Sequence, residues 1–434
     1  MSLRKQLWWW AAAAGILFSG AAAGQSDDGE RISIRPSSRP PRAATNPAAT
    51  PPRKAVLSLQ GNSDERRRSS SAAAAEITPA SRLPESECLA LAKDIERDAK
   101  EGNGGVFDRS IDRATLARLI TADVNAPAEE AQAYANDFVS SFRPGDEVRR
   151  LLRGKGSFHF LRLKTDDGQR RALMRLVAGN FVNYYELLLT RGPGERVMVA
   201  DVLVYSLGQP ASEFARDMFR LSRELPEPRK AMRDADAVLR LAGDGAGNQA
   251  LLACAKLPSE LREQRAIVIA RCTAAAQVSP EEQRKALAEY RGLFSMDGMV
   301  ELSSLNAYLK WKQFDDFDAA MYRLERLVGE DACLQCFRAG AAAARGELTA
   351  ARQRADDAVR MEDGLQLAHE TVLAVALRQK DYPAVAKELL ALETRFAVRF
   401  NNLEKQRDFH GFVRSAAYAQ WKRDRDKAVA GAGN

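Results

Sequence analysis

Histidine is scarce in this chain: three residues among 434, so few side chains are suited to proton transfer near neutral pH. The sequence also lacks a glycine-rich phosphate loop, a paired-histidine metal motif and the local signature of a nucleophilic triad. These absences argue against the common phosphoryl-transfer, metal-dependent and nucleophilic enzymes. No cofactor and no metal are therefore expected.

An excess of charge is also missing from the part of the chain that is expected to fold. The whole chain carries +7. Arg4 and Lys5 account for +2, and residues 24–80, with nine basic and six acidic side chains, account for +3, which leaves +2 for residues 81–434. Nucleic-acid-binding domains concentrate positive charge on one face. A nucleic-acid partner is therefore not expected.

Long apolar runs are lacking except near the N-terminus, where residues 7–23 carry no charge and follow Arg4 and Lys5. Ala21 and Ala23 are small enough for a cleavage site, so residues 1–23 are predicted to be a signal peptide. The mature chain would then be periplasmic or secreted. The alternative is an uncleaved anchor, since 17 mostly apolar residues are at the lower limit of what spans a bilayer. The membrane becomes a partner only in that case.

A linker is predicted next, over residues 24–80, which hold seven of the 17 prolines and no aromatic side chain. Such a composition buries too little apolar surface to offset the entropy of ordering, so disorder is expected. About 350 residues remain, which suits two domains.

A repeated pattern organises the C-terminal half. The segments 316–320, 347–351 and 381–385 each place a large apolar residue three positions before a small or branched one. The large residues are Phe317, Leu348 and Tyr382, at spacings of 31 and 34. Periods near 34 are typical of stacked helix pairs. Residues 296–396 resemble the tetratricopeptide family, which implies a helical surface that binds another protein or peptide; the alternative is an irregular helical bundle.

The middle of the chain has mixed character. Helical periodicity is followed by four strand-like runs separated by turn signals, at residues 157–164, 171–178, 181–190 and 196–205. Helices followed by an antiparallel meander resemble the cone-shaped cystatin-like fold of the nuclear transport factor and ketosteroid isomerase superfamily, over residues 85–221. That resemblance implies a pocket inside the cone, used for catalysis, small ligands or partners.

The predicted fold is thus an α+β cone-like domain followed by an all-α helical-repeat domain. The cone-like domain is expected at residues 81–225, the repeat domain at 226–425 and a disordered tail at 426–434. Residues 403–423 are expected to form one helix that caps the array.

Four polar residues on the predicted strands are candidates for a pocket: Asp201, His159, Tyr184 and Tyr205. Alternation places Asp201 on the face of Val199, so partial burial would raise its pKa and make it a general base. The alternative is that Asp201 hydrogen-bonds a neighbour and His159 is exposed or satisfied. No oxyanion-stabilising pair is marked by sequence, as the enzymes of the resembled superfamily would require.

Cysteines offer two further hypotheses. Cys254 and Cys272 flank a turn between two expected helices, so a disulfide between them is compatible with an exported chain. Cys333 and Cys336 suit a local disulfide or buried thiols. A metal site at that pair would need two more ligands, which the sequence does not supply nearby.

The sequence therefore predicts an exported, non-catalytic scaffold that binds another protein or peptide through a helical-repeat surface. The alternative hypothesis is a small-ligand binder or isomerase-like enzyme that uses the cone pocket.

Overall fold

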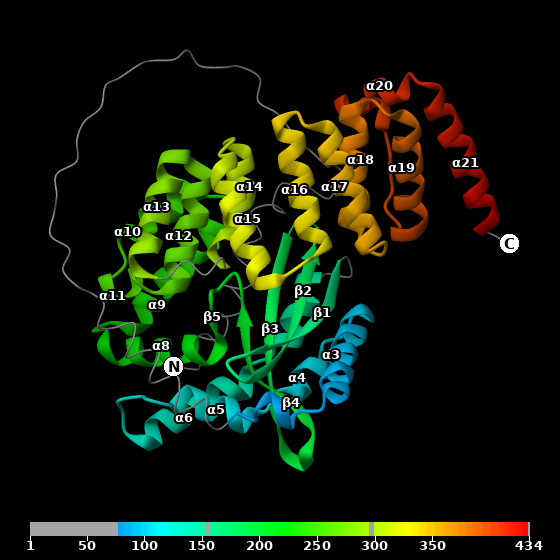
Figure 1. The fold of residues 1–434 in the computed structure, drawn as a ribbon. Helices are drawn as coiled ribbons and strands as arrows, with labels where there is room; N and C mark the ends of the chain where they lie inside the picture. The colour runs from blue at the N-terminus through cyan, green and yellow to red at the C-terminus, as the bar shows by residue number, and fades with distance from the viewer. Residues whose placement is uncertain (1–76, 153–155, 180, 295–298, 433–434) are drawn as a thin grey trace.

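The computed structural model describes residues 77–152, 156–179, 181–294 and 299–432. The predicted signal peptide and nearly all of the predicted linker lie outside these residues. Helices come first, a single antiparallel sheet follows, and a long succession of helices completes the chain (Figure 1). An α+β region followed by helices is therefore confirmed. Within the described residues, no helix has the length and apolarity needed to cross a membrane.

The helices before the sheet are amphipathic. The first one buries Cys88, Ala92, Ile95 and Ala99, which recur every three or four residues and so form a single stripe. Asp112 caps a later helix by accepting a hydrogen bond from the backbone N–H of Thr115 at 3.1 Å. These helices are α3 (Glu85–Lys100), α4 (Gly105–Ser110), α5 (Arg113–Thr121), α6 (Ala128–Ser141) and α7 (Pro144–Leu152).

The sheet is an antiparallel meander whose strands follow chain order, which confirms the four predicted strands. Asp167 and Gly168 both have positive φ, as a two-residue hairpin turn requires. Bulges interrupt the pairing between Phe160 and Arg162 and between Leu188 and Leu189. The strands are β1 (Ser157–Asp166), β2 (Gln169–Ala178), β3 (Phe181–Arg191), β4 (Val197–Val204) and the short β5 (Gln209–Pro210).

One face of the sheet is apolar and is filled by the preceding helices. The ring of Phe158 on β1 stacks on Phe107 of α4 with centroids 6.0 Å apart and meets Tyr185 of β3 edge-on at 5.3 Å. Directly paired residues of antiparallel strands share a face. Arg175 and Tyr184 are such a pair, one position away from Tyr185. The opposite face therefore carries polar side chains.

Helices after the sheet form a regular series. Helix α8 (Ala211–Glu224) begins directly after β5, and α9 (Pro228–Gly243) follows α8. The remaining ones are α10 (Gly247–Ala255), α11 (Ser259–Arg262), α12 (Arg265–Val278), α13 (Pro280–Leu293), α14 (Met299–Lys310), α15 (Phe314–Val328), α16 (Ala332–Arg345), α17 (Leu348–Met361), α18 (Gln366–Gln379) and α19 (Tyr382–Phe396). We refer to α12–α19 as the array.

The array repeats with a period of 34 residues. The second helix of each pair begins at Pro280, Phe314, Leu348 and Tyr382, which are successive intervals of 34. The sequence pattern pairs Phe317 with Leu348, but the residue equivalent to Leu348 is Phe314. The predicted interval of 31 is therefore wrong, and the true interval is 34. A regular spacing in four pairs indicates stacked repeats, and it includes the pair α12–α13.

The turn between the two helices of a pair recurs with the same period. Lys312, Gly346 and Lys380 all have positive φ and lie 34 residues apart. A left-handed residue after a helix is a common way to end it. Two of these three positions hold lysine, which is uncommon in this conformation, so glycine alone could not mark the repeat in the sequence.

The C-terminal end differs from the prediction in two ways. Residues 403–423 do not form one helix: they contain short helical turns, α20 (His410–Val413) and the start of α21 (Ala416–Ala432). Phe409, Phe412 and Trp421 are nevertheless buried against the end of the array, as a cap requires. Helix α21 also extends through most of the predicted tail 426–434, where alanine favours helix.

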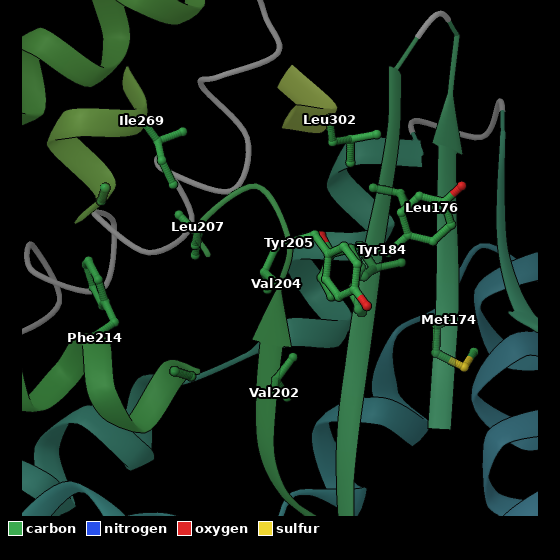
Figure 2. Close-up of a cluster of buried hydrophobic side chains, with 14 of the residues drawn as sticks. Met174, Leu176, Tyr184, Val202, Val204, Tyr205, Leu207, Phe214, Ile269 and Leu302 are labelled. Carbon is green, nitrogen blue, oxygen red and sulfur yellow. The ribbon is translucent and has the colours of Figure 1, made fainter. Parts of the chain in front are cut away.

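The two predicted domains share one hydrophobic core. A continuous cluster of buried apolar residues runs from Leu83 in the N-terminal region to Ala368 in α18. Figure 2 shows part of this cluster, in which side chains from the sheet, from α8 and from the array, including Phe214, Ile269 and Leu302, form one group. The sheet and the array are therefore packed together as one structure.

Candidate functional site at the sheet–array junction

Asp201 is buried, but it has a structural role. Its side chain is 6% exposed, and its Oδ1 accepts hydrogen bonds from the backbone N–H groups of Val202 at 2.8 Å and Ser212 at 3.2 Å. The hydroxyl of Ser212 donates to Oδ2. Burial raises the pKa of Asp201, and these hydrogen bonds act in the opposite direction. Asp201 therefore holds the start of α8 against β4.

The predicted position of Asp201 on the face of Val199 was wrong. Leu188 pairs with Asp201 and Leu189 pairs with Val199, so the bulge between them inserts Ala200 as an extra residue. Since Leu188 and Leu189 point to opposite faces, Asp201 and Val199 do as well. A one-residue shift of this kind moves a side chain to the other face of a sheet.

His159 also has a hydrogen-bond partner, which is Glu96 and not Asp201. Its side chain is 32% exposed, and its Nδ1 forms a hydrogen bond with Oε1 of Glu96 on α3. Burial opposes the charge of Glu96, but hydrogen bonds from His159 and Lys93 outweigh it and lower the pKa of Glu96 to about 2. The pair fastens α3 to the edge strand β1.

Tyr184 and Tyr205 lie together, with ring centroids 5.7 Å apart. The hydroxyl of Tyr205 donates to Glu186 of the same sheet at 2.6 Å, and that of Tyr184 donates to Asp331 at the start of α16, also at 2.6 Å. Burial, followed by the charge of Asp331, raises the pKa of Tyr184 well above its ordinary value. Of the four candidates, these two share a site, and that site reaches the array.

Arg175 is the centre of this site. Its side chain is 0% exposed, and one end of its guanidinium donates to both carboxylate oxygens of Glu362, at 2.7 and 2.6 Å. The other end donates to Asp331, which is also buried. Glu362 lies between α17 and α18, and Asp331 lies between α15 and α16. One arginine on β2 thus binds two of the turns that connect one helix pair of the array to the next, before α16 and before α18. We call Arg175, Tyr184, Asp331 and Glu362 the junction cluster.

A second group of contacts lies beside the junction cluster. The ammonium group of Lys164 on β1 donates to Glu186 at 2.5 Å and to the backbone carbonyl of Leu327, in the last turn of α15, at 3.1 Å. Arg162 on the same strand donates to the carbonyl of Glu330. Between them, Gly329 has φ of 76° and ψ of −163°, and an added Cβ would lie 2.3 Å from the Arg162 guanidinium. Glycine is therefore required at this point of contact.

This arrangement is suited to holding two structures together. A buried charge without a partner is costly, so a guanidinium bound by two carboxylates, with a tyrosine donating to one of them, fixes the relative position of sheet and array. The described surface has two depressions. Residues of α5 and α6 line one of them, and residues 227–230 and Arg233 line the other. Neither includes a residue of the junction cluster or any of the four predicted candidates, and the apolar face of the sheet is filled by side chains.

All five cysteines are free thiols and all are buried. Cys254 on α10 and Cys272 on α12 lie on helices that pack together, as predicted, but no disulfide joins them in the structure. Cys333 and Cys336, in the first turns of α16, are likewise unbonded, and burial raises the pKa of Cys336 to about 12. Within the described residues, no group of three or more histidine, cysteine or acidic side chains could hold a metal ion.

The sequence analysis missed Arg175, Asp331 and Glu362. One signal was present: Arg175 interrupts the otherwise apolar run of Ala172, Leu173, Met174, Leu176 and Val177. A charge within a strand that is buried on both faces requires a partner, but the sequence gives no indication of where that partner is.

Comparison with known proteins adds no relative. No protein-family model, no curated protein and no solved structure matches this chain.

Proposed function

We propose that this chain is a non-catalytic interaction protein whose array presents a binding surface to another protein or peptide. The observation that carries the proposal is the regular 34-residue period of four helix pairs. Stacked pairs form extended surfaces, which proteins of this kind use for binding. The array would belong to the tetratricopeptide-like class, and the sheet with its helices to the cone-like class.

Exposed apolar side chains on the array support this proposal. Leu293 and Met361 occupy the same position of two repeats, at the ends of α13 and α17, and each is 45% exposed. Tyr322 on α15 is 63% exposed. Aromatic residues and methionine are enriched in protein interfaces.

We also propose that the protein is periplasmic or secreted, on the strength of its N-terminal sequence.

The alternative enzyme or small-ligand hypothesis has little structural support. Its proposed base, Asp201, accepts three hydrogen bonds from its own neighbourhood, and neither described depression includes it.

Site-specific photo-crosslinking tests the proposal. A photo-reactive phenylalanine analogue would replace Tyr322, Leu293 or Met361 in turn, and Leu89 of α3, which is 41% exposed, would serve as the control. We expect the array positions to give the same discrete protein adduct in the producing cells, while Leu89 gives none. Equal labelling at all four positions, or no array adduct together with turnover of a small molecule, would contradict the proposal.

A further inference from the structure

The last helix pair of the array holds a buried histidine. His369 lies on α18, and α19 packs beside this helix (Figure 1). The Nδ1 atom of His369 lies 2.7 Å from Oε2 of Glu388 on α19, and its Nε2 lies 3.0 Å from the backbone carbonyl oxygen of Asp363. The imidazole ring is therefore held between two acceptors, one on the neighbouring helix and one in the turn before its own helix.

Two acceptors require two donors. A neutral imidazole has one N–H group and one lone pair, whereas the protonated ring donates from both nitrogens. If the ring were neutral, one of the two oxygens would face a lone pair instead of a hydrogen. The same contacts form when the proton sits on the Glu388 carboxyl and is donated to Nδ1, so the extra proton belongs to the pair of residues. We call His369 and Glu388 the latch pair.

The surrounding charges balance only when the latch pair holds this proton. Glu388 is buried, and among the described residues no side chain other than His369 donates a hydrogen bond to it. Arg395 of α19 binds both carboxylate oxygens of Asp363, at 2.7 and 2.5 Å, and these hydrogen bonds lower the pKa of Asp363. The guanidinium of Arg395 also lies 3.5 Å from Nε2 of His369. Two carboxylates and one guanidinium leave one negative charge uncompensated, and a buried charge without a partner is costly.

The latch pair lies where α19 meets the turn that the sheet binds. Asp363 directly follows Glu362, which accepts both hydrogen bonds from one end of Arg175. Helix α19 contributes its buried apolar residues to a small cluster with the C-terminal cap, separate from the main core; they are Val385, Leu389 and Leu392. A region with its own core can open while the rest of a protein stays folded.

We propose that the latch pair is a pH-sensitive fastening between α18 and α19. While the pair holds its proton, the ring of His369 binds both Glu388 and the turn residue Asp363, and α19 stays docked. When pH rises, the proton is released to solvent, and one of the two contacts is lost. Glu388 is then a buried carboxylate beside a neutral ring. The fastening therefore weakens with rising pH, and α19 opens more often.

Regulation of the array surface follows from this fastening. Met361, one of the exposed residues assigned above to the binding surface, lies two residues before Asp363. Opening of α19 would remove the contacts of His369 and Arg395 with Asp363, and so would free the turn next to Met361. This consequence rests on the proposed function. The fastening itself is a property of the isolated chain and is measured without a partner.

Hydrogen exchange of the full chain, followed by mass spectrometry, tests the proposal. Protection factors correct for the intrinsic effect of pH on exchange. They would be compared at about pH 5.5 and about pH 8.5, which bracket the range in which histidine usually changes charge. We expect the protection of α19 to fall at least about tenfold more than that of α12, because a hydrogen bond to a charged group is one of the stronger ones.

Three variants assign the effect to the latch pair. His369→Gln cannot take up a proton, and Glu388→Gln removes the carboxylate that requires one. We expect the pH response of α19 to disappear in both. In Glu388→Gln the new amide can donate to Nδ1 while Nε2–H donates to Asp363, so protection should stay high at both pH values. His410→Gln, at an exposed position on α20, is the matched control and should keep the response of the natural chain.

Three results would overturn the proposal. The first is equal protection of α19 at the two pH values in the natural chain. The second is a pH response that persists in Glu388→Gln, which would assign it to another group. The third is an equal fall in α12, which would indicate a loss of stability of the whole chain. Thermal unfolding verifies that each variant is folded, and Glu388→Gln remains decisive if His369→Gln does not fold. None of these results bears on whether the array binds a partner.

Discussion

Replacing Arg175 with methionine tests whether the junction cluster holds the sheet and the array together. Methionine preserves much of the apolar length of the side chain and removes the guanidinium. Asp331, which is buried, would then lose its cation, and Glu362 would lose both of its hydrogen bonds from Arg175. Tyr184 would remain as a donor to Asp331.

The expected loss is large. Removing one partner of a buried ion pair typically costs about 3–5 kcal/mol, because the other charge stays buried without compensation. For the roughly 350 residues that the structure describes, a loss near 4 kcal/mol corresponds to a fall of about 5 °C in the melting temperature. The matched control is Arg149→Met on α7, whose ion pair with Asp146 has both side chains more than half exposed and should contribute at most about 1 kcal/mol.

The double variant Arg175→Met with Asp331→Asn separates the ion pair from simple packing. Asparagine is neutral, so it removes the buried charge that the first substitution leaves behind. We expect the double variant to recover about 0.5–3 kcal/mol relative to Arg175→Met, as residues of one network do. Chemical denaturation gives the free energies, and hydrogen exchange in α16–α18 should rise in the single variant. A loss below about 1 kcal/mol for Arg175→Met, with unchanged exchange, would refute this account of the junction.

Three further predictions concern the other candidate residues. Asp201→Ala should cost about 1–3 kcal/mol of unfolding free energy, because the buried donors of Ser212 and Val202 lose their acceptor. Asp201→Asn keeps one oxygen and should cost less. Equal losses in denaturation would contradict this. The folded-state pKa of Glu96, about 2, lies below its ordinary value of 4.5. The ionised carboxylate of Glu96 therefore stabilises the fold above pH 4.5, and this stabilisation is lost as pH falls towards 2. His159→Leu should flatten that loss in denaturation curves measured across this range. Native reduced protein should show almost no cysteine alkylation until it unfolds, because all five thiols are buried. Mass mapping of the non-reduced, exported protein tests the predicted Cys254–Cys272 bridge.

Local signals in the sequence predicted the elements of this fold well. The Asp167–Gly168 turn and the flanking apolar runs specify a hairpin whichever tertiary contacts surround it. The sequence pattern predicts the repeat but misplaces its register in one pair, because Phe314 and Phe317 are both large and apolar and lie three residues apart. Only the helix start at Phe314 distinguishes them.

The junction cluster could not be predicted in the same way. Arg175 is 156 residues from Asp331 and 187 residues from Glu362. Periodicity reports which face of an element is buried, and it is silent about which distant element covers that face. The bulge at Ala200 was hidden for a related reason: strict alternation assumes an uninterrupted strand, and a single extra residue reverses the face of every residue after it.

The position of the junction cluster explains why a sheet accompanies the array. In a stacked array each helix pair contacts mainly its neighbours, so small changes between pairs accumulate along its length. Asp331 begins the pair α16–α17, and Glu362 lies immediately before the pair α18–α19. Because Arg175 binds both, the angle between these pairs is set by a rigid strand as well as by their own contacts. A surface with a fixed shape loses less entropy on binding than one that must first be ordered. The sheet would thus contribute to binding by preorganising the array. Arg175→Met should therefore weaken binding to an array partner even at temperatures where the variant remains folded.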